Sequence, residues 1–372
     1  MSIGTKVPYV NVAAQHSPIR DKLLAAVGNV IDHGQFILGA EVGEFERCFA
    51  ELCGVHYAIG VNSGTDALIL ALRVLGIGLG DEVITVANSF VASASCIALV
   101  GARPVFVDVR EDLNIDPALI ETAITSHTRA IIPVHLTGRP ADMDSILEIA
   151  QANDLYVIED CSQAVGAEYK GRCIGSFGTL GCFSMHPLKT LNACGDGGTI
   201  TTKDSELCEK LKVLRNVGHV SRDEVVVWSG NSRLDTLQAS ILLAKLEYLG
   251  EWTKKRRTNA RFYQQRLADL QTVQVPIEKP HEKAVYHTFV IQVDRREDLR
   301  DYLADMGIRT AIHYPLPIHL QKAAEALGYK PGELPVTERQ AERVLSLPVY
   351  PELETHQLEY VAGNIRSFYE HG

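Results

Sequence analysis

Short apolar runs alternate with longer segments of helical periodicity through the first two thirds of the chain. The short runs, bounded by turn residues, predict buried strands, and the periodic segments predict amphipathic helices. The expected strands are 56–61, 82–86, 104–109, 130–134, 156–159, 181–185 and 198–202, and the expected helices are 18–34, 39–54, 65–75, 90–100, 143–152 and one that begins at Pro117. This alternation indicates βαβ units, and so an α/β fold whose parallel sheet is covered by helices on both faces.

The pattern changes in the last third of the chain. Two long helices are expected at 233–249 and 252–270, and their apolar faces could close the sheet domain and link it to the next. A strand at 284–293, helices at 296–306 and 317–327, and a last helix from Thr355 then follow. We therefore expect a large domain of residues 1–249 and a small C-terminal α/β domain of residues 250–372.

Composition excludes several classes of partner. The 372 residues are 46% hydrophobic and 22% charged, which is enough for a large core, and the net charge is −10. The one basic cluster, Lys254–Arg257, lies in a helical pattern and is interpreted as a solvated face. An acidic surface of mixed charge argues against nucleic acid and against an anionic membrane as partners.

The eight cysteines show no paired framework, no CxxC, and no spacing with histidine that would suit a metal. We expect reduced thiols and no metal site. The first eleven residues lack a signal pattern, and no apolar stretch is long enough to span a bilayer. The expectation is a soluble, cytoplasmic protein.

The strongest chemical signal is the stretch from Cys182 to Lys189, followed by a glycine-rich turn at 195–198. A lysine that forms a Schiff base must be pinned by its flanks, partly desolvated and aimed into a cleft. An ordinary surface lysine before a turn is the commoner case. The other motifs favour the reactive lysine, because they supply the remaining parts of a pyridoxal phosphate site.

Two of these motifs follow predicted strands, where ligands of open α/β sheets bind. Gly64 and Thr65 begin a helix after the first strand, and free N–H groups there could hold a phosphate. Asp160 follows a buried strand and could pair with a pyridinium nitrogen, and Gln163 could reach the phenolic oxygen of the ring. Simple helix capping is the alternative for Ser63, Thr65 and Asp160.

Four further segments could line the same cleft. Phe90 could stack on a planar ring, although a core position is commoner for phenylalanine, and Ser184 could add a hydroxyl to the phosphate. Asn231 lies in a polar loop before a helix, where capping is the simpler interpretation. The loop 313–319 contains two fixed prolines and the rings of His313, Tyr314 and His319, which suits a substrate cleft.

Taken together, these segments resemble the DegT/DnrJ/StrS family of nucleotide-sugar aminotransferases, which are pyridoxal phosphate enzymes of fold type I, the aspartate aminotransferase fold. The resemblance covers nearly the whole chain. It rests on five motifs in the family order, at 63–68, 159–164, 183–198, 231–235 and 313–315. It implies a large domain with a mostly parallel seven-stranded sheet and a small C-terminal α/β domain.

The resemblance also implies roles for individual residues. Lys189 would be the Schiff-base lysine and the proton shuttle, Asp160 would pair with the pyridinium nitrogen, and Gln163 with the phenolic oxygen. Phe90 would stack on the ring, while Gly64, Thr65 and Ser184 would hold the phosphate. Asn231 would reach the phosphate of a neighbouring subunit, which implies a homodimer with shared active sites. Tyr314 and His319 would contact the sugar substrate.

The implied reaction moves an amino group from L-glutamate through pyridoxamine phosphate to a keto-sugar. The sequence Gly195–Asp196–Gly197–Gly198 resembles members that act at C3 of nucleotide-linked 3-keto sugars. A 4-keto sugar and a keto-sugar without a nucleotide remain alternatives.

Three other functions are considered. Sugar dehydratases of the same fold use histidine in place of the lysine, and His186 lies nearby, but the family pattern aligns Lys189 with the lysine. A non-catalytic cofactor-bound regulator would have lost the lysine or the phosphate site, and neither is lost. A nicotinamide-dependent dehydrogenase is disfavoured because the first βα turn lacks GxGxxG.

Overall fold

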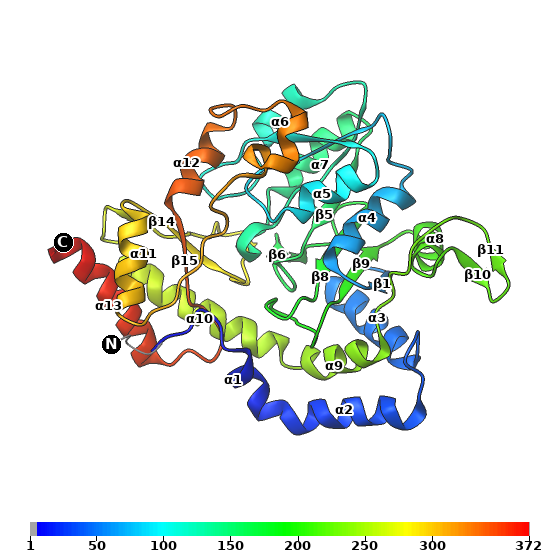
Figure 1. Ribbon diagram of the computed structural model, residues 1–372, viewed down its shortest axis with the longest axis horizontal. Coiled ribbons are helices and arrows are strands. Elements are labelled where there is room, and N and C mark those ends of the chain that lie inside the picture. Colours follow the sequence, from blue (N-terminus) through cyan, green and yellow to red (C-terminus); the bar gives the residue numbers. More distant parts are fainter. Residues whose placement is uncertain (1–5, 372) are drawn as a thin grey trace.

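A seven-stranded sheet forms the centre of the larger part of the molecule (Figure 1). The computed structural model describes residues 6–371. In spatial order the strands are β1 (Tyr57–Val61), β9 (Gly198–Thr202), β8 (Leu180–Ser184), β5 (Tyr156–Asp160), β4 (Thr128–Ile131), β2 (Glu82–Val86) and β3 (Arg103–Val107). β9 is antiparallel to both of its neighbours and the other pairs are parallel. The predicted mostly parallel sheet is therefore confirmed.

Helices cover both faces of this sheet because alternate side chains of each strand point to opposite sides. In β2, Ile84 and Val86 join one apolar cluster and Val83 joins the other. The first cluster is covered by α3 (Ala40–Cys53), α6 (Pro117–Ala123), α7 (Met143–Ala152) and α9 (Thr236–Leu246). The second is covered by α4 (Gly64–Val74), α5 (Ala92–Leu99) and α8 (Ser205–Arg215).

A smaller unit follows at the C-terminal end, around a sheet of order β12 (Val273–Gln274), β14 (Phe289–Val293) and β15 (Val344–Leu347). It also contains α11 (Arg296–Asp305) and α13 (Thr355–His371), while α12 (Pro335–Arg343) contacts both β14 and the larger unit, where Asp108 accepts hydrogen bonds from the Val336 and Thr337 N–H groups. The long helix α10 (Leu249–Leu267) joins the two units: Leu249 packs in the first core, and Tyr263 packs in the second. Val7 also packs in the second core. The division at residues 249 and 250 stays a prediction.

The remaining elements are short or lie at the surface. α2 (Arg20–His33) lies along α9, and the hairpin of β10 (His219–Ser221) and β11 (Glu224–Val225) extends away from the body (Figure 1). The others are α1 (Val12–His16), the 3-10 helices η1 (Ser17–Ile19), η2 (Leu136–Gly138), η3 (Ile318–Leu320) and η4 (Lys322–Leu327), and the small sheet β13 (Glu282–Lys283), β6 (Glu168–Tyr169) and β7 (Arg172–Cys173). Among residues 6–371, no helix combines the length and the apolar character needed to cross a membrane.

Two sequence predictions are wrong in detail, and two helices were missed. The helix expected at 317–327 is two 3-10 turns, because Gln321 between them is extended, with φ −72° and ψ 147°. The strand expected at 284–293 begins only at Phe289, since Tyr286 has a φ of +49°, which a strand cannot continue. Helices α8 and α12 were not predicted.

Candidate active site

The site forms where the carboxyl ends of neighbouring parallel strands meet, which is the position expected for ligands of such sheets. β5 ends at Asp160 and the adjacent β8 ends at Ser184, with Asp160 in register with Cys182. Lys189 follows β8 within a few residues, in the loop that leads to β9. The topology therefore brings Asp160, Ser184 and Lys189 to one edge of the sheet.

Asp160 is buried and held at both of its carboxylate oxygens. Its Oδ2 accepts a hydrogen bond from the Ser93 hydroxyl at 2.8 Å, and its Oδ1 accepts one from the Ser162 N–H at 3.1 Å. Ser93 lies in α5 and makes a second hydroxyl contact, at 2.8 Å, with Ser89. The carboxylate is thus fixed in orientation by two neutral donors, and no cation of the described chain neutralises it by an ion pair.

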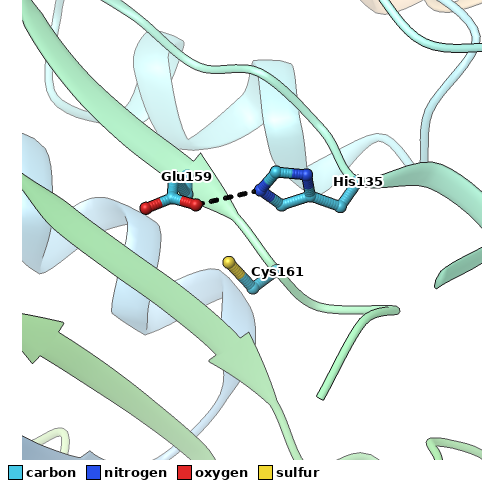
Figure 2. A group of neighbouring side chains, drawn as sticks. All are labelled: His135, Glu159 and Cys161. Carbon is cyan, nitrogen blue, oxygen red and sulfur yellow. Dashed lines mark hydrogen bonds and ion pairs between the residues drawn. The ribbon is translucent and has the colours of Figure 1, made fainter. Parts of the chain in front are cut away.

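Glu159, the residue before Asp160, lies in a closed network that supports the end of the strand (Figure 2). Its carboxylate accepts hydrogen bonds from His135 Nε2 at 3.2 Å and from the N–H groups of Gly175, Phe177 and Gly178, each at 2.8 Å. Burial alone would raise the pKa of Glu159, but the hydrogen bond and charge of His135 and these N–H donors outweigh it and lower that pKa.

His135, Glu159 and Cys161 lie close enough together to suggest a metal site (Figure 2). The ring nitrogens of His135 are both in use, however, because Nδ1 accepts the Ala141 N–H at 2.9 Å while Nε2 contacts Glu159. The backbone N–H of His135 also donates to the backbone carbonyl of Asp160 at 3.1 Å. We interpret the cluster as structural support for Asp160 rather than as a set of ligands.

Lys189 has the properties of a reactive amine. Its side chain is only partly exposed, and burial lowers the pKa of its amine to about 8 although the charge of Asp160 acts in the opposite direction. A substantial fraction of the amine is therefore neutral near physiological pH, and only the neutral amine is a nucleophile.

The N-terminus of α4 meets the end of β8. Ser63 caps the helix by accepting the Asp66 N–H at 3.1 Å, which leaves the N–H groups of Gly64 and Thr65 to point outward from a helix of eleven residues. A Cβ on Gly64 would lie 2.6 Å from the Cβ of Ser184. Glycine is therefore required for the close approach of the two segments. Gly64, Thr65 and Ser184 therefore lie side by side, where they could hold an anion.

Gln163, Tyr314 and Phe90 lie together on another side of the site. The Oε1 of Gln163 accepts the Thr137 N–H at 2.7 Å, so its amide group is oriented with Nε2 toward the Tyr314 hydroxyl, 3.4 Å away. The rings of Phe90 and Tyr314 have centroids 6.2 Å apart, and Phe90 is 54% exposed. Phe90 is thus not a core residue, and its ring is free to contact a ligand.

His287 was missed as a site residue, and His313 was noted only as one of the rings of the loop 313–319. Burial, followed by the charge of Lys189, lowers the pKa of His313 to about 4. Burial also lowers the pKa of His287 well below its usual value, and the charges of Lys189 and Arg256 act in the same direction. His313 also contacts the Ser346 hydroxyl at 2.8 Å. His313 was visible in the proline-rich loop motif, whereas nothing in the sequence around His287 pointed to the site.

Asn231 and His319 are not brought to Lys189 in this chain. Asn231 is exposed and its backbone pairs with Asn216. The side chain of His319 is fully buried between Phe106 and Tyr329, and its Nε2 contacts Glu338 at 3.1 Å. In this position His319 has no surface to offer a substrate, which is a correction to the substrate contact expected of it. The expected role of Asn231 requires a second chain.

Comparison with known proteins gives one family. The model of the DegT/DnrJ/EryC1/StrS aminotransferase family matches residues 18–366. A UDP-N-acetyl-3-dehydro-α-D-glucosamine 3-aminotransferase of Acidithiobacillus ferrooxidans is 46% identical over 371 residues, with 98% of this chain and 99% of that protein covered. A protein of Geobacillus stearothermophilus named as a pleiotropic regulatory protein is 43% identical over 368 residues, with 98% and 99% covered.

Solved structures agree with this result. The crystal structure of Streptomyces venezuelae DesV in complex with a ketimine intermediate has a TM-score of 0.97 and 42% identity, with 100% of both chains covered. The structure of NtdA from Bacillus subtilis with bound cofactor PMP has a TM-score of 0.93 and 32% identity, with 98% of this chain and 86% of that chain covered. The chain therefore belongs to the DegT/DnrJ/EryC1/StrS aminotransferase family and has its fold.

Proposed function

We propose that this aminotransferase uses pyridoxal 5′-phosphate to move an amino group from L-glutamate to a nucleotide-linked 3-keto sugar. The observation that carries the proposal is Lys189: a partly buried amine whose pKa is lowered to about 8, beside the buried carboxylate of Asp160. Transamination needs both a nucleophilic amine and a carboxylate that can face a ring nitrogen.

The residues present fit the cofactor at each of its polar groups. The outward N–H groups of Gly64 and Thr65, with the Ser184 hydroxyl, suit a phosphate at a helix N-terminus. The oriented Nε2 of Gln163 suits a phenolic oxygen, because it is a donor whose partner Oε1 is already occupied. When bound, pyridoxal phosphate supplies a conjugated ring that accepts electron density from the carbon bearing the amino group.

The residues of this chain would hold and move the proton. Asp160, fixed by Ser93 and Ser162, would keep a proton on the ring nitrogen, and a buried carboxylate with neutral donors is suited to that charge. Lys189, once released as a neutral amine, would take a proton from the substrate carbon and return it at the neighbouring position. Phe90, with its exposed ring, would cover one face of the cofactor.

The acceptor is proposed from the relatives. The name of the Acidithiobacillus relative specifies amino transfer at C3 of a UDP-linked sugar, and the coverage of both chains is almost complete. The neutral imidazole of His313 and the hydroxyl of Tyr314 are polar groups near Lys189 that suit sugar hydroxyls. L-glutamate as donor remains the expectation from the family resemblance.

A homodimer is proposed from the exposed apolar surface. Apolar side chains are exposed along α2, in segment 36–38 and in the hairpin 219–228, where Trp228 is 88% exposed. Ile37 pairs with Asp235, which brings segment 36–38 next to the loop that contains Asn231. Exposed apolar side chains of this kind suit an interface between two copies of the chain, which would place Asn231 at the boundary with a partner chain. The eight unpaired cysteines support the expected reducing compartment, the cytoplasm.

The oligomer can be tested with Trp228→Glu. A charge in the proposed interface is expected to shift the protein from dimer to monomer in light scattering, and to lower affinity for the cofactor if Asn231 is shared between subunits. Ile277→Glu, which adds the same single negative charge at an exposed apolar position outside the proposed interface, is the matched control. A wild-type protein that is monomeric at micromolar concentration would contradict the proposal.

The function is tested by the absorbance spectrum of the purified protein with pyridoxal phosphate, before and after addition of L-glutamate. We expect a visible band that is replaced by a near-ultraviolet band when the cofactor receives the amino group. A visible band that does not respond to glutamate would contradict the proposed donor. Absence of a protein-dependent band would contradict the proposed cofactor site.

A further inference from the structure

α9 contains a single lysine, Lys245, and its side chain is completely buried. Burying an amine of this kind costs free energy unless its donors are satisfied. Within residues 6–371, its Nζ bonds to oxygen and sulfur atoms of the Lys189 loop and to no carboxylate: Asn192 O at 2.8 Å, Asn192 Oδ1 at 2.6 Å and Cys194 Sγ at 3.8 Å. A buried lysine directed entirely at the loop of the active-site lysine calls for an explanation.

Asn192 connects Lys245 to Lys189 by hydrogen bonds. Its Nδ2 donates to the backbone carbonyl of Lys189 at 3.0 Å and to Gln15 Oε1 at 3.2 Å. Because Nζ of Lys245 donates to the amide oxygen, the amide of Asn192 can have only one orientation, with its NH2 group toward the Lys189 carbonyl. Lys245 therefore fixes which way Asn192 faces, and Asn192 fixes the peptide group of Lys189.

A second side chain of α9 holds the other end of the same loop. Gln238, seven residues before Lys245 and on the same side of the helix, accepts the Cys194 N–H at 2.8 Å. At the start of the loop, the Lys189 N–H donates to the His186 carbonyl at 2.8 Å. Residues 189–194 are thus held from both ends, and Lys245 is the buried centre of that support.

We propose that Lys245 is a positioning residue for Lys189: acting through Asn192, it fixes the Lys189 carbonyl and so the direction in which the Lys189 amine enters the site. The proposal rests on the reactive role of Lys189 given above. A lysine side chain has four rotatable bonds, so its amine is placed accurately only if its backbone is fixed. A misplacement of about 1 Å can cost about 100-fold in rate.

Two variants separate positioning from simple stability. Lys245→Met keeps most of the apolar stem and removes Nζ. Asn192→Asp keeps two acceptors for Lys245 and adds an opposite charge, but removes the donor to the Lys189 carbonyl. Lys254→Met, an exposed lysine on α10, is the matched control. The measurements are the thermal midpoint of the cofactor-free protein, kcat and KM, and the pH midpoint of the visible band of the loaded enzyme.

The expected result is that both variants lower kcat by about tenfold or more while KM changes by less than about twofold. The pH midpoint should shift by about half a unit or more, because the Lys189 nitrogen, which carries the cofactor in the loaded enzyme, no longer has one environment. In Asn192→Asp the fall in kcat should persist at a temperature well below the thermal midpoint of the variant, and the control should match wild type. Wild-type kcat and pH midpoint in Asn192→Asp would overturn the proposal, as would a Lys245→Met protein that loses only thermal stability. Failure of wild type to show a visible band would instead contradict the role of Lys189.

Discussion

Lys189 and Lys245 lie at the two ends of one hydrogen-bonded chain and have opposite surroundings. Lys245 is completely buried and its Nζ contacts three acceptors of the Lys189 loop. Lys189 is partly exposed, and the effect of Asp160 on its pKa is smaller than that of burial, so its amine titrates near pH 8. Burial therefore has two outcomes. The amine of Lys245, which has hydrogen-bond acceptors, holds a loop in place, and the amine of Lys189, which lacks them, becomes a nucleophile.

Replacement of Lys189 should have the largest effect on activity. Lys189→Met keeps the stem but removes the nucleophile and proton carrier, so turnover should fall by about 1000-fold or more. Steady-state transamination with L-glutamate is the measurement, and the thermal midpoint shows that the protein is folded. Turnover within tenfold of wild type would remove Lys189 from its role.

Asp160→Asn should have the next largest effect. The amide has nearly the same shape but cannot stabilise a positive charge on a ring nitrogen, so turnover should fall by about 100-fold while the cofactor remains bound. Ser93→Ala, which removes one hydrogen bond to the same carboxylate, should cost about tenfold or less. Equal effects of the two variants would mean that the charge of Asp160 does not matter.

Stability should change in opposite directions at the two lysines. Lys245→Met leaves the buried backbone oxygen of Asn192 without its donor and leaves Asn192 Oδ1 with only its His16 contact at 3.4 Å, and it should lower the free energy of unfolding by about 2 kcal/mol. Lys189→Met should leave it unchanged or raise it at neutral pH. Because the pKa of Lys189 is lowered in the folded chain, the unfolded chain binds more protons than the folded one between about pH 8 and about pH 10. The charged Lys189 amine therefore destabilises the fold fully below pH 8, and this destabilisation is lost as pH rises through that range.

Denaturant unfolding at pH 7 and pH 10 checks this sign. The difference between Lys189→Met and wild type should become smaller at the higher pH, whereas Lys245→Met should be less stable than wild type at pH 7. A Lys189→Met protein that is less stable than wild type at pH 7 would show that the amine of Lys189 is stabilised rather than strained by its surroundings.

The smallest effect concerns amine reactivity with pH. In the cofactor-free protein, the rate of acylation of Lys189 should rise with pH and reach half of its maximum near pH 8, because only the neutral amine reacts. Lys245 should stay unlabelled in the folded protein, since it has no exposed surface. Peptide mass mapping after a short pulse of reagent measures both. A half-maximum near pH 10 would mean that Lys189 is not desolvated.

The part of the site on the sheet edge could be predicted from the sequence, and so could the loop that carries Tyr314, but the contacts made by long-range packing could not. Asp160, Ser184 and Lys189 follow strands, so their meeting follows from parallel topology alone. His287 and Lys245 come together with Lys189 through long-range packing that leaves no local pattern. His319 is the opposite case: its loop was predicted to line a substrate cleft, but its imidazole is buried against Glu338.

The most direct test of the account is to identify which lysine the cofactor modifies. The purified protein is incubated with pyridoxal phosphate, reduced with borohydride, digested and mapped by mass spectrometry. We expect one pyridoxyl group, on Lys189, because this amine is both accessible and largely desolvated. A label on Lys245, on several surface lysines in equal amounts, or on none would contradict it.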